Sequence, residues 1–337
     1  SDMFGRKTPL YAGLALFAVG GVGAALAPNV EWLIAFRFIQ GLGATAGMVV
    51  PRAIVRDLHT GAEAARLMSL LMLVFSVSPI LAPLVGSIVI EALGWRAVFW
   101  FVTGAAFIGM MLISAIKETR PPERRIGSSF GSALVGYKVL IRDRNFLGLT
   151  FIGSFGIASF FIYLASSSFV LIEHYGLSPT LYSIAFSVNA VAFFAMAQLT
   201  GPLTERFGLA RVVRVAVAGY SATAVILMAA MSGGAQGLEV LVAGLFVSFG
   251  FLGLVIPSTA VLAMEEHGEI AGTASALMGT LQFVTGAVAM GVSGLFFDGT
   301  PLPMVAGIAV AAVIALVLAQ STLGRRQSAT ARREPAE

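Results

Sequence analysis

Arg37 stands inside a long apolar stretch, three positions before Gln40. A charged side chain within a membrane span costs roughly 2.5–3.5 kcal/mol on insertion scales, so we expect Arg37 to face a polar cavity or a partner carboxylate. Residues three apart share one face of a helix, so Gln40 can hydrogen-bond the same partner or bridge two helices. Alternatively, Arg37 extends to the outer interface near Trp32. Arg37 and Gln40 are therefore the first candidates for ligand or proton chemistry.

Four further residues suggest a binding surface. The polar pair Asn189 and Gln282 stands in apolar stretches that also carry Phe160 and Tyr163. An apolar, aromatic lining with a few polar groups suits varied lipophilic molecules. Aromatic residues in such stretches also face lipid or pack against one another.

The residues disfavour an enzyme. The three histidines, His59, His174 and His267, fall in predicted loops, and the sequence holds no cysteine and no His-Glu-x-x-His motif. No Asp or Glu lies deep in an apolar stretch, so we expect neither a carboxylate pair for catalysis nor a carboxylate for proton coupling within the predicted spans.

The elements that position these residues are predicted to be membrane-spanning helices. Hydrophobic residues make up 58% of the 337 residues and charged residues 11%, which is typical of an integral membrane protein. Stretches of about 20 apolar residues are long enough to cross a bilayer and must be helical there. Ten spans are expected, at residues 9–27, 30–55, 67–90, 97–116, 146–172, 181–199, 212–231, 238–264, 271–297 and 303–323.

The distribution of charge predicts the orientation. Most of the 21 Lys and Arg residues fall on alternate connections between spans. By the positive-inside rule that side is cytoplasmic, which places both ends of the chain in the cytoplasm and the protein in the inner (plasma) membrane. The basic residues are explained by topology, so no nucleic-acid partner is expected.

The sequence also repeats itself. Gly47 to Pro51 matches Gly253 to Pro257, and Asp2 corresponds to Glu205, at a nearly constant offset of roughly two hundred residues. The first four spans would thus correspond to the last four. We expect twelve spans in two pseudo-symmetric halves, with the first two missing from this chain. Two five-span inverted repeats would require a shorter offset.

This repeat predicts the domains. An N-terminal half of four helices covers residues 1–116, and a cytoplasmic central loop covers residues 117–145. A C-terminal half of six helices covers residues 146–323, and a cytoplasmic tail covers residues 324–337. In the central loop, Phe130, Leu134, Tyr137 and Ile141 share one helical face, which indicates an amphipathic helix at the membrane interface. A solvated linker is the alternative.

Two short charged segments precede apolar spans at corresponding positions, and we expect tight loops there. Their acidic residues can cap helix N-termini or pair with the basic residues; alternatively, the turns only set topology. The residues concerned are Asp2, Gly5, Arg6, Glu205, Arg206 and Gly208.

Helix packing motifs are also present. Gly43 and Gly47 are spaced for close helix contact, as are Ala82 and Gly86. Pro79 and Pro83 lie within one predicted span, where they remove backbone hydrogen bonds and permit bending.

These motifs together resemble the major facilitator superfamily, specifically the twelve-span drug:proton antiporters of the bicyclomycin-resistance (Bcr/CflA) type. Asp2, Gly5, Arg6 and Lys7 are similar to the end of motif A, although Met3 stands where a basic residue is expected. The Arg-x-x-Gln-Gly sequence that begins at Arg37 resembles motif B. The segment 78–86, which holds Pro79, Pro83 and Gly86, resembles motif C, the mark of antiporters.

The resemblance implies a monomeric efflux transporter for small lipophilic drugs, driven by the proton gradient and without a cofactor. Its partners would be the drug, protons and the lipid bilayer. Alternating access would rock one half against the other, with the motif A loops latching the cytoplasmic side. The family's coupling carboxylate belongs to the first helix, so we expect residues 1–337 alone not to perform coupled efflux.

Other functions stay open at this point. The chain could be an importer or exporter of a metabolite with the same fold, or a membrane fragment that does not transport.

Overall fold

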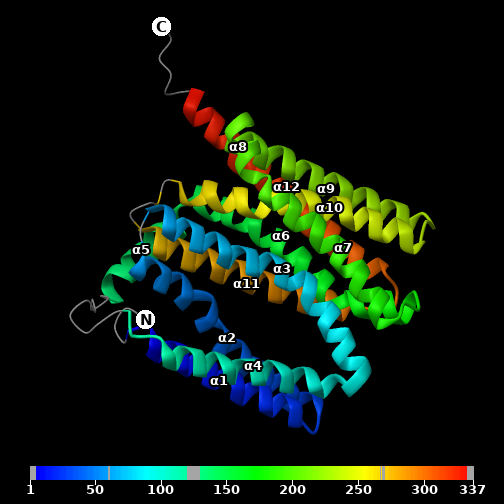
Figure 1. Ribbon diagram of the computed structural model, residues 1–337. Helices are drawn as coiled ribbons and strands as arrows, with labels where there is room; N and C mark the ends of the chain where they lie inside the picture. Colours follow the sequence, from blue (N-terminus) through cyan, green and yellow to red (C-terminus); the bar gives the residue numbers. More distant parts are fainter. Residues whose placement is uncertain (1–4, 60, 120–129, 266, 268–269, 332–337) are drawn as a thin grey trace. The chain divides into compact units, whose positions relative to one another are not determined.

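The computed structural model describes residues 5–59, 61–119, 130–265, 267 and 270–331. These residues form α-helices joined by short turns, with one π-helical segment (Figure 1). Contacts between residues divide the chain into two compact units, Ser1–Ser129 and Phe130–Glu337. The dividing point lies inside the predicted central loop.

Unit 1 contains four long helices. They are α1 (Lys7–Leu26), α2 (Val30–Leu58), α3 (Gly61–Leu93) and α4 (Trp95–Ala115). Helix α1 packs closely against both α2 and α4, whereas α3 makes few contacts with its neighbours α2 and α4. Figure 1 shows α1 and α4 side by side.

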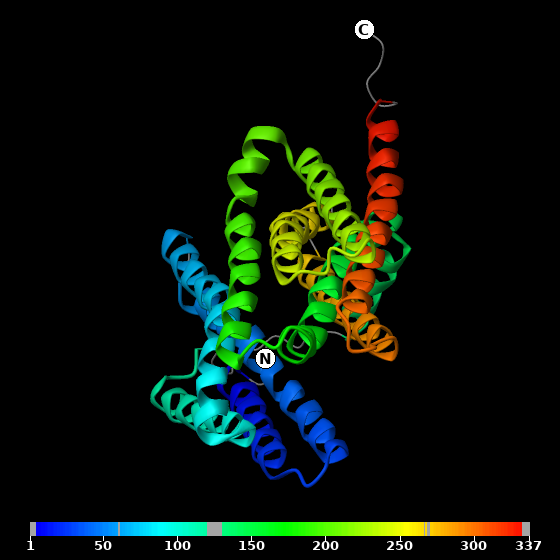
Figure 2. The same cartoon turned by 90° about the vertical axis from the view of Figure 1, so that its right-hand side faces the viewer.

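Unit 2 contains eight α-helices and the π-helical segment among its described residues. They are α5 (Phe130–Arg142), α6 (Arg144–Ser168), η2 (Phe169–His174), α7 (Pro179–Gln198), α8 (Thr200–Phe207), α9 (Leu209–Ser232), α10 (Leu238–Met264), α11 (Ala271–Leu295) and α12 (Leu302–Ala331). Helix α6 packs against α10, α11 and α12, and α9 packs against α10 and α12. In Figure 2, α12 can be followed from orange to red as one long helix.

The helices match the predicted spans. Nine helices of the described residues are long and apolar enough to cross a membrane. The tenth expected span, residues 67–90, lies within the 33-residue helix α3. Gly94, Gly176, Gly234 and Gly299 lie in connections between these helices, and each has a positive φ that disfavours other residues.

One predicted loop is wrong. Residues 200–207 form helix α8, where a tight loop was expected before the span that begins near residue 209. Charged residues in this segment suggested a loop, but they are compatible with a short helix at the end of a span. Gly208, with φ of 81°, ends α8 and begins α9.

The backbone repeats at the spacing that the sequence repeat predicts. Gly5 and Gly208, with φ of 84° and 81°, each stand shortly before a span, and so do Gly94 and Gly299, with φ of 81° and 84°. The packing repeats as well, because α1 contacts α2 and α4 as α9 contacts α10 and α12. These similarities favour the predicted correspondence between the four helices of unit 1 and the last four of unit 2.

The units differ in how much of their helices they bury. Only 17% of the α2 span and 11% of α4 are buried, against 44% of the corresponding α10 and α12. In unit 2, α6 covers α10, α11 and α12, and α7 covers α10. The described residues of unit 1 hold no counterpart of α6 and α7, so apolar faces of its helices stay exposed.

Small residues allow α1 and α2 to approach closely. A side chain at Gly43 would collide with the backbone of Gly13 and Phe17 on α1. Among the described residues, Gly47 and Gly86 on α3 have no neighbour within 4 Å of an added Cβ. Close helix contact at these two glycines therefore stays a prediction.

The central loop contains a helix, as predicted, and residues outside the predicted apolar face pack against the rest of unit 2. Gly136 and Leu140 of α5 are buried, with Gly136 against Thr273 of α11. Leu134 and Ile141, which the periodicity placed on the apolar face, are 64% and 56% exposed. The exposed apolar face would suit contact with the membrane surface, but the location of α5 at the membrane interface stays a prediction.

Candidate functional site

A buried ion pair joins α1 and α2 at one end of unit 1. Arg6 is only 3% exposed, and its guanidinium donates from Nε to Asp57 Oδ2 at 2.6 Å and from Nη2 to Asp57 Oδ1 at 3.1 Å. Two parallel hydrogen bonds between a guanidinium and a carboxylate give strength and a fixed orientation. Asp57 stands in the last turn of α2, so the pair ties the end of α2 to the beginning of α1.

Glu118 completes this charged cluster of Arg6, Asp57 and Glu118. Its Oε1 accepts from the Arg6 backbone N–H at 2.9 Å, and its Oε2 accepts from the Lys7 backbone N–H at 3.1 Å. A carboxylate at a helix N-terminus satisfies free N–H groups and complements the helix dipole. Lys7 Nζ in turn donates to the carbonyl of Ile116, just beyond α4, at 2.7 Å. The cluster therefore holds the ends of α1, α2 and α4 together.

The sequence-based assignment of the charged segments is corrected here. Arg6 pairs with Asp57, and the cap of α1 is Glu118, whereas Asp2 lies outside the described residues. In unit 2, Glu205 lies within α8 and is exposed, and the residue before α9 is Gly208, which has no side chain to cap the helix. Arg206 stacks over the Phe207 ring at 5.3 Å. The two segments share their glycine turn but not their charge contacts.

Arg37 and Gln40 share one face of α2, as predicted. Arg37 Nη1 donates to Gln40 Oε1 at 2.7 Å, and the guanidinium lies 5.8 Å from the centre of the Phe99 ring on α4. Arg37 is exposed, while Gln40 is 1% exposed. Within the described residues no carboxylate pairs with Arg37. An exposed cation within an apolar span is costly in lipid, which favours a polar environment for Arg37 in the membrane.

Gln40 is anchored deep between three helices. Gly20 of α1 packs directly against it, and the space beside Gly21 is taken by Gln40 Nε2 and by Thr103 Oγ1 of α4. Both of these polar atoms are buried without a hydrogen-bond partner among the described residues. Gln40 thus orients Arg37 from a fixed position.

Two of the predicted binding residues are in direct contact in unit 2. Asn189 Nδ2 of α7 donates to Tyr163 Oη of α6 at 3.0 Å, and each of these residues is 1% exposed. Phe160 lies one turn away on α6 and contacts Phe249 of α10, which also contacts Tyr163. The Asn189 carbonyl oxygen is buried without a partner among the described residues. We call Phe160, Tyr163, Asn189 and Phe249 the aromatic cluster.

Gln282 does not belong to the aromatic cluster. It lies on α11, 8% exposed, where its Nε2 and Thr259 Oγ1 of α10 crowd the space beside Gly153 of α6. Gly153 and Tyr163 are ten residues apart on one helix, which is about 15 Å along its axis. The sequence grouped Gln282 with Asn189, Phe160 and Tyr163 by residue type, which carries no information on how far apart they lie along the helix axis.

The motif C residues lie on one helix, as the sequence predicts. Pro79, Pro83 and Gly86 all fall within α3, and its helix continues through them. The side chain of Pro79 lies outside the described part of the structure, and Pro83 is half-buried.

One polar contact in unit 2 was not predicted. Asp143 caps α6 by accepting from the backbone N–H groups of Asn145 and Phe146, and its Oδ2 lies 2.8 Å from His267 Nε2. Burial opposes the charged form of Asp143, but these N–H groups and His267 outweigh it and lower its pKa. The contact links the start of α6 to the segment after α10. An Asp just before an apolar span is the signal that identifies such a cap.

Long apolar helices that bury an ion pair at their ends and carry an arginine within a span are typical of a polytopic membrane protein. Comparison with known protein families identifies the family of this membrane protein. Residues 1–290 match the Major Facilitator Superfamily, so the chain belongs to this family and is a transporter of its class.

Relatives and solved structures agree with this family. The chain is 37% identical over 318 residues to the "Uncharacterized MFS-type transporter YdgK" of Bacillus subtilis, covering 93% of this chain and 78% of the relative. It is 27% identical to the "Bicyclomycin resistance protein homolog" of Haemophilus influenzae, covering 94% and 79%. The crystal structure of a D-xylose–proton symporter superposes with a TM-score of 0.71 at 17% identity, covering 94% of this chain and 80% of that one, and so shares the fold.

Proposed function

We propose that this protein exports small lipophilic drugs across the inner membrane by proton antiport, as a monomer that alternates access to a central site. The observation that carries the proposal is the similarity to the bicyclomycin resistance protein homolog along 94% of the chain. The motif C segment on α3 supports it, since that motif resembles the antiporters of the family. Both ends of the chain are placed in the cytoplasm by the positive-inside rule.

The aromatic cluster is the proposed contact for the drug in unit 2. Its rings offer an apolar surface that accepts varied lipophilic molecules without fixed polar geometry. The Asn189 carbonyl oxygen, buried and without a partner among the described residues, is the acceptor available to a donor group on the drug. Tyr163 and Asn189 are closed off at 1% exposure, so the drug must displace neighbouring side chains to reach them.

Arg37 is the proposed coupling residue in unit 1. Gln40, packed against Gly20, fixes the guanidinium on the exposed face of α2. A fixed positive charge at that place would lower the pKa of a nearby carboxylate and make proton release depend on what else occupies the site.

We also propose that the coupling carboxylate is on a helix outside residues 1–337. The exposed faces of α2 and α4 support this, because their counterparts α10 and α12 are covered by packing that includes α6. Two helices on the faces of α2, α3 and α4 would bury them and place a carboxylate near Arg37. On this proposal, residues 1–337 alone do not perform coupled efflux.

The test is drug accumulation in cells that lack their own efflux pumps. The protein is expressed with any residues that its gene encodes before Ser1, and a fluorescent lipophilic cation such as ethidium is followed over time. We expect lower accumulation than with empty vector, reversed by a protonophore, and abolished in Arg37→Ala. Equal accumulation with well-expressed, folded protein would reject efflux of that drug class. Export that resists the protonophore would reject proton coupling.

A further inference from the structure

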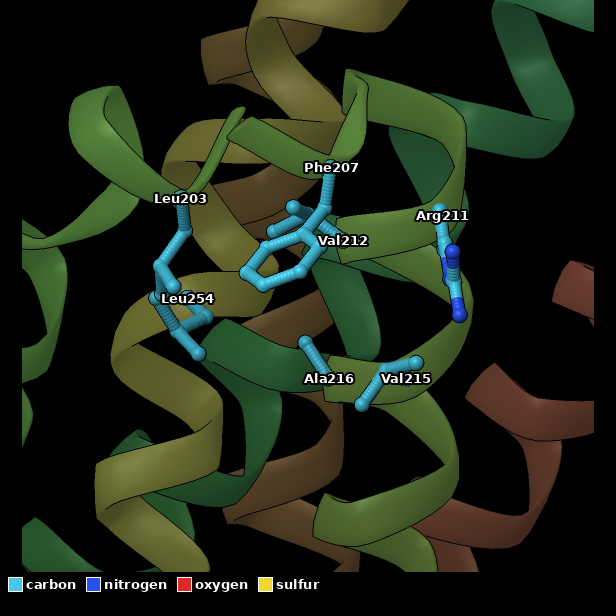
Figure 3. A pocket seen from close by; sticks show the side chains of 7 residues that line it. All are labelled: Leu203, Phe207, Arg211, Val212, Val215, Ala216 and Leu254. Carbon is cyan, nitrogen blue, oxygen red and sulfur yellow. The ribbon is translucent and has the colours of Figure 1, made fainter. Parts of the chain in front are cut away.

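A pocket of about 270 Å³ lies in unit 2 where α8, α9 and α10 meet (Figure 3). Leu203 and Phe207 come from α8, Val215 and Ala216 from α9, and Leu254 from α10. Figure 3 shows the Phe207 ring in the middle, with Leu203 and Leu254 on one side and Arg211 on the other. The lining is apolar apart from Arg211.

The depth of the pocket places it within the hydrocarbon layer. Val215 lies six residues into α9 and Leu254 ten residues before the end of α10, which correspond to about 9 Å and 15 Å along the helix axes. Half of a hydrocarbon core is about 15 Å thick. The pocket therefore extends from the end of the span towards the middle of the bilayer.

The pocket opens towards the outside of the helix bundle of unit 2. Val215 is 60% exposed and Phe207 is 46% exposed, although both are apolar and line the pocket. Apolar side chains exposed along a span meet lipid acyl chains. A volume of about 270 Å³ falls below the roughly 300–1,000 Å³ of pockets for drug-sized ligands, so a slender chain fits better than a drug.

Positive charge is concentrated in the segment that lines the pocket. Arg206, Arg211 and Arg214 lie within nine residues, and Glu205 is the acidic residue of that segment. Arg206 and Arg211 are exposed. Guanidinium groups at the end of a span attract and hydrogen-bond phosphate, and basic pockets between spans select anionic headgroups.

We propose that this pocket binds one anionic phospholipid of the adjacent leaflet, with an acyl chain between Phe207, Val215 and Leu254 and the phosphate on Arg211. Occupation would wedge the lipid between α8 and α9 and stabilise the short helix α8. The proposal concerns lipid binding and does not depend on what the protein transports or in which direction.

Photo-crosslinking tests the location directly. The purified full-length protein is placed in nanodiscs that contain a phosphatidylglycerol with a photoreactive group on its acyl chain, and cross-linked peptides are mapped by mass spectrometry. A phosphatidylcholine with the same group is the second arm. We expect cross-links concentrated in residues 203–216 and 254 with the anionic lipid, and weaker, scattered cross-links with the zwitterionic lipid. Equal cross-linking of this segment by both lipids, or no concentration there, would overturn the proposal.

Variants test the two contacts. Arg211→Gln should lower cross-linking at the pocket about fivefold, the loss expected for one basic residue near an anionic surface. Val215→Trp should lower it by filling the mouth. The matched controls are Arg142→Gln, an exposed arginine on α5, and Val225→Trp, an exposed valine farther along α9. Thermal unfolding and gel filtration establish that each variant is folded. If Arg211→Gln behaves like Arg142→Gln, Arg211 does not hold the phosphate.

Discussion

Arg6 and Asp57 are 51 residues apart in the chain, and yet they form a two-pronged ion pair with hydrogen bonds of 2.6 and 3.1 Å. When Gly5 is aligned with Gly208, Arg6 corresponds to Leu209 of unit 2, and when Pro51 is aligned with Pro257, Asp57 corresponds to Ala263. Both of these residues are apolar. This ion pair therefore has no counterpart at the equivalent positions of unit 2. The two units share a backbone pattern but are held together differently at this end.

Arg6→Ala should destabilise unit 1. The substitution removes the guanidinium that donates to the Asp57 carboxylate, at a site where Arg6 is only 3% exposed. Hydrogen bonds to charged groups contribute about 1.5–3 kcal/mol, and we expect a loss in that range, because Asp57 keeps some contact with solvent. The measurement is the free energy of unfolding in mixed micelles.

A double-mutant cycle with Asp57→Ala isolates the pair. The sum of the losses in free energy of unfolding in the two single variants should exceed the loss in the double variant. Arg206→Ala is the control, because Arg206 stands beside the equivalent glycine turn and is exposed. It should change the free energy of unfolding by less than about 0.5 kcal/mol. Additive single losses at Arg6 and Asp57 would contradict the pairing.

Glu118→Ala should loosen the first turn of α1. The Arg6 and Lys7 backbone N–H groups lose their acceptors, and a lost helix cap costs about 0.5–2 kcal/mol. Hydrogen exchange at residues 6 and 7 should become faster, while the middle of α1 is unchanged. Lys117→Ala, at the neighbouring exposed position, should leave the exchange as in the wild type; the same acceleration in both variants would argue against the cap.

Gly43→Ala and Gly47→Ala should have opposite effects, although they lie one turn apart on α2. An added methyl at residue 43 meets the backbone of Gly13 and Phe17, which cannot move aside cheaply, so a loss of about 1–3 kcal/mol is expected. Residue 47 is in open space, where alanine favours the helix by up to about 1 kcal/mol. Thermal unfolding of the two variants is compared directly. A Gly43→Ala variant as stable as Gly47→Ala would mean that α1 does not approach α2 closely at Gly43, and destabilisation by Gly47→Ala would mean that residue 47 is packed against another helix.

Asp143 should make stability depend on pH. Its pKa is lowered in the folded protein, so its contribution is complete above its ordinary value of 3.8 and disappears as the pH falls through the folded value. The difference in melting temperature between wild type and Asp143→Ala should have its full size above pH 3.8 and should narrow as the pH falls through the folded pKa, which lies below 3.8. A gap that does not narrow as the solution is made more acidic would show that packing, and not charge, is lost in the variant. His267→Gln keeps a donor for Asp143 and is expected to change less than His267→Ala.

Much of the fold could be predicted because the bilayer restricts the possibilities. Apolar stretches of span length have to be helices, and the glycines at positions 5, 94, 208 and 299 mark where they begin. The short helix α8 escaped prediction, since Glu205 and Arg206 in a segment between two spans resemble a loop. A helix of eight residues has no length signal of its own.

Less of the site could be predicted. Motif spacing correctly placed Arg37 and Gln40 on one face, because an interval of three is a property of the helix itself. The partners of Arg6 could not be found in this way, since Asp57 and Glu118 are 51 and 112 positions away and only the packing of α1 with α2 and α4 brings them close. Gln282 was grouped with Asn189 by residue type, although it lies at another depth of unit 2.

The most direct test of proton antiport is drug flux in proteoliposomes with an imposed pH difference. The protein is reconstituted with any residues that its gene encodes before Ser1, and uptake of a lipophilic cation is compared between vesicles that are acidic inside and vesicles that are acidic outside. The account predicts uptake against a concentration gradient only when the interior is acidic, because protons leave as the drug enters, with loss of this uptake in Arg37→Ala. Uptake driven by an acidic exterior, or flux that ignores the direction of the pH difference, would contradict it.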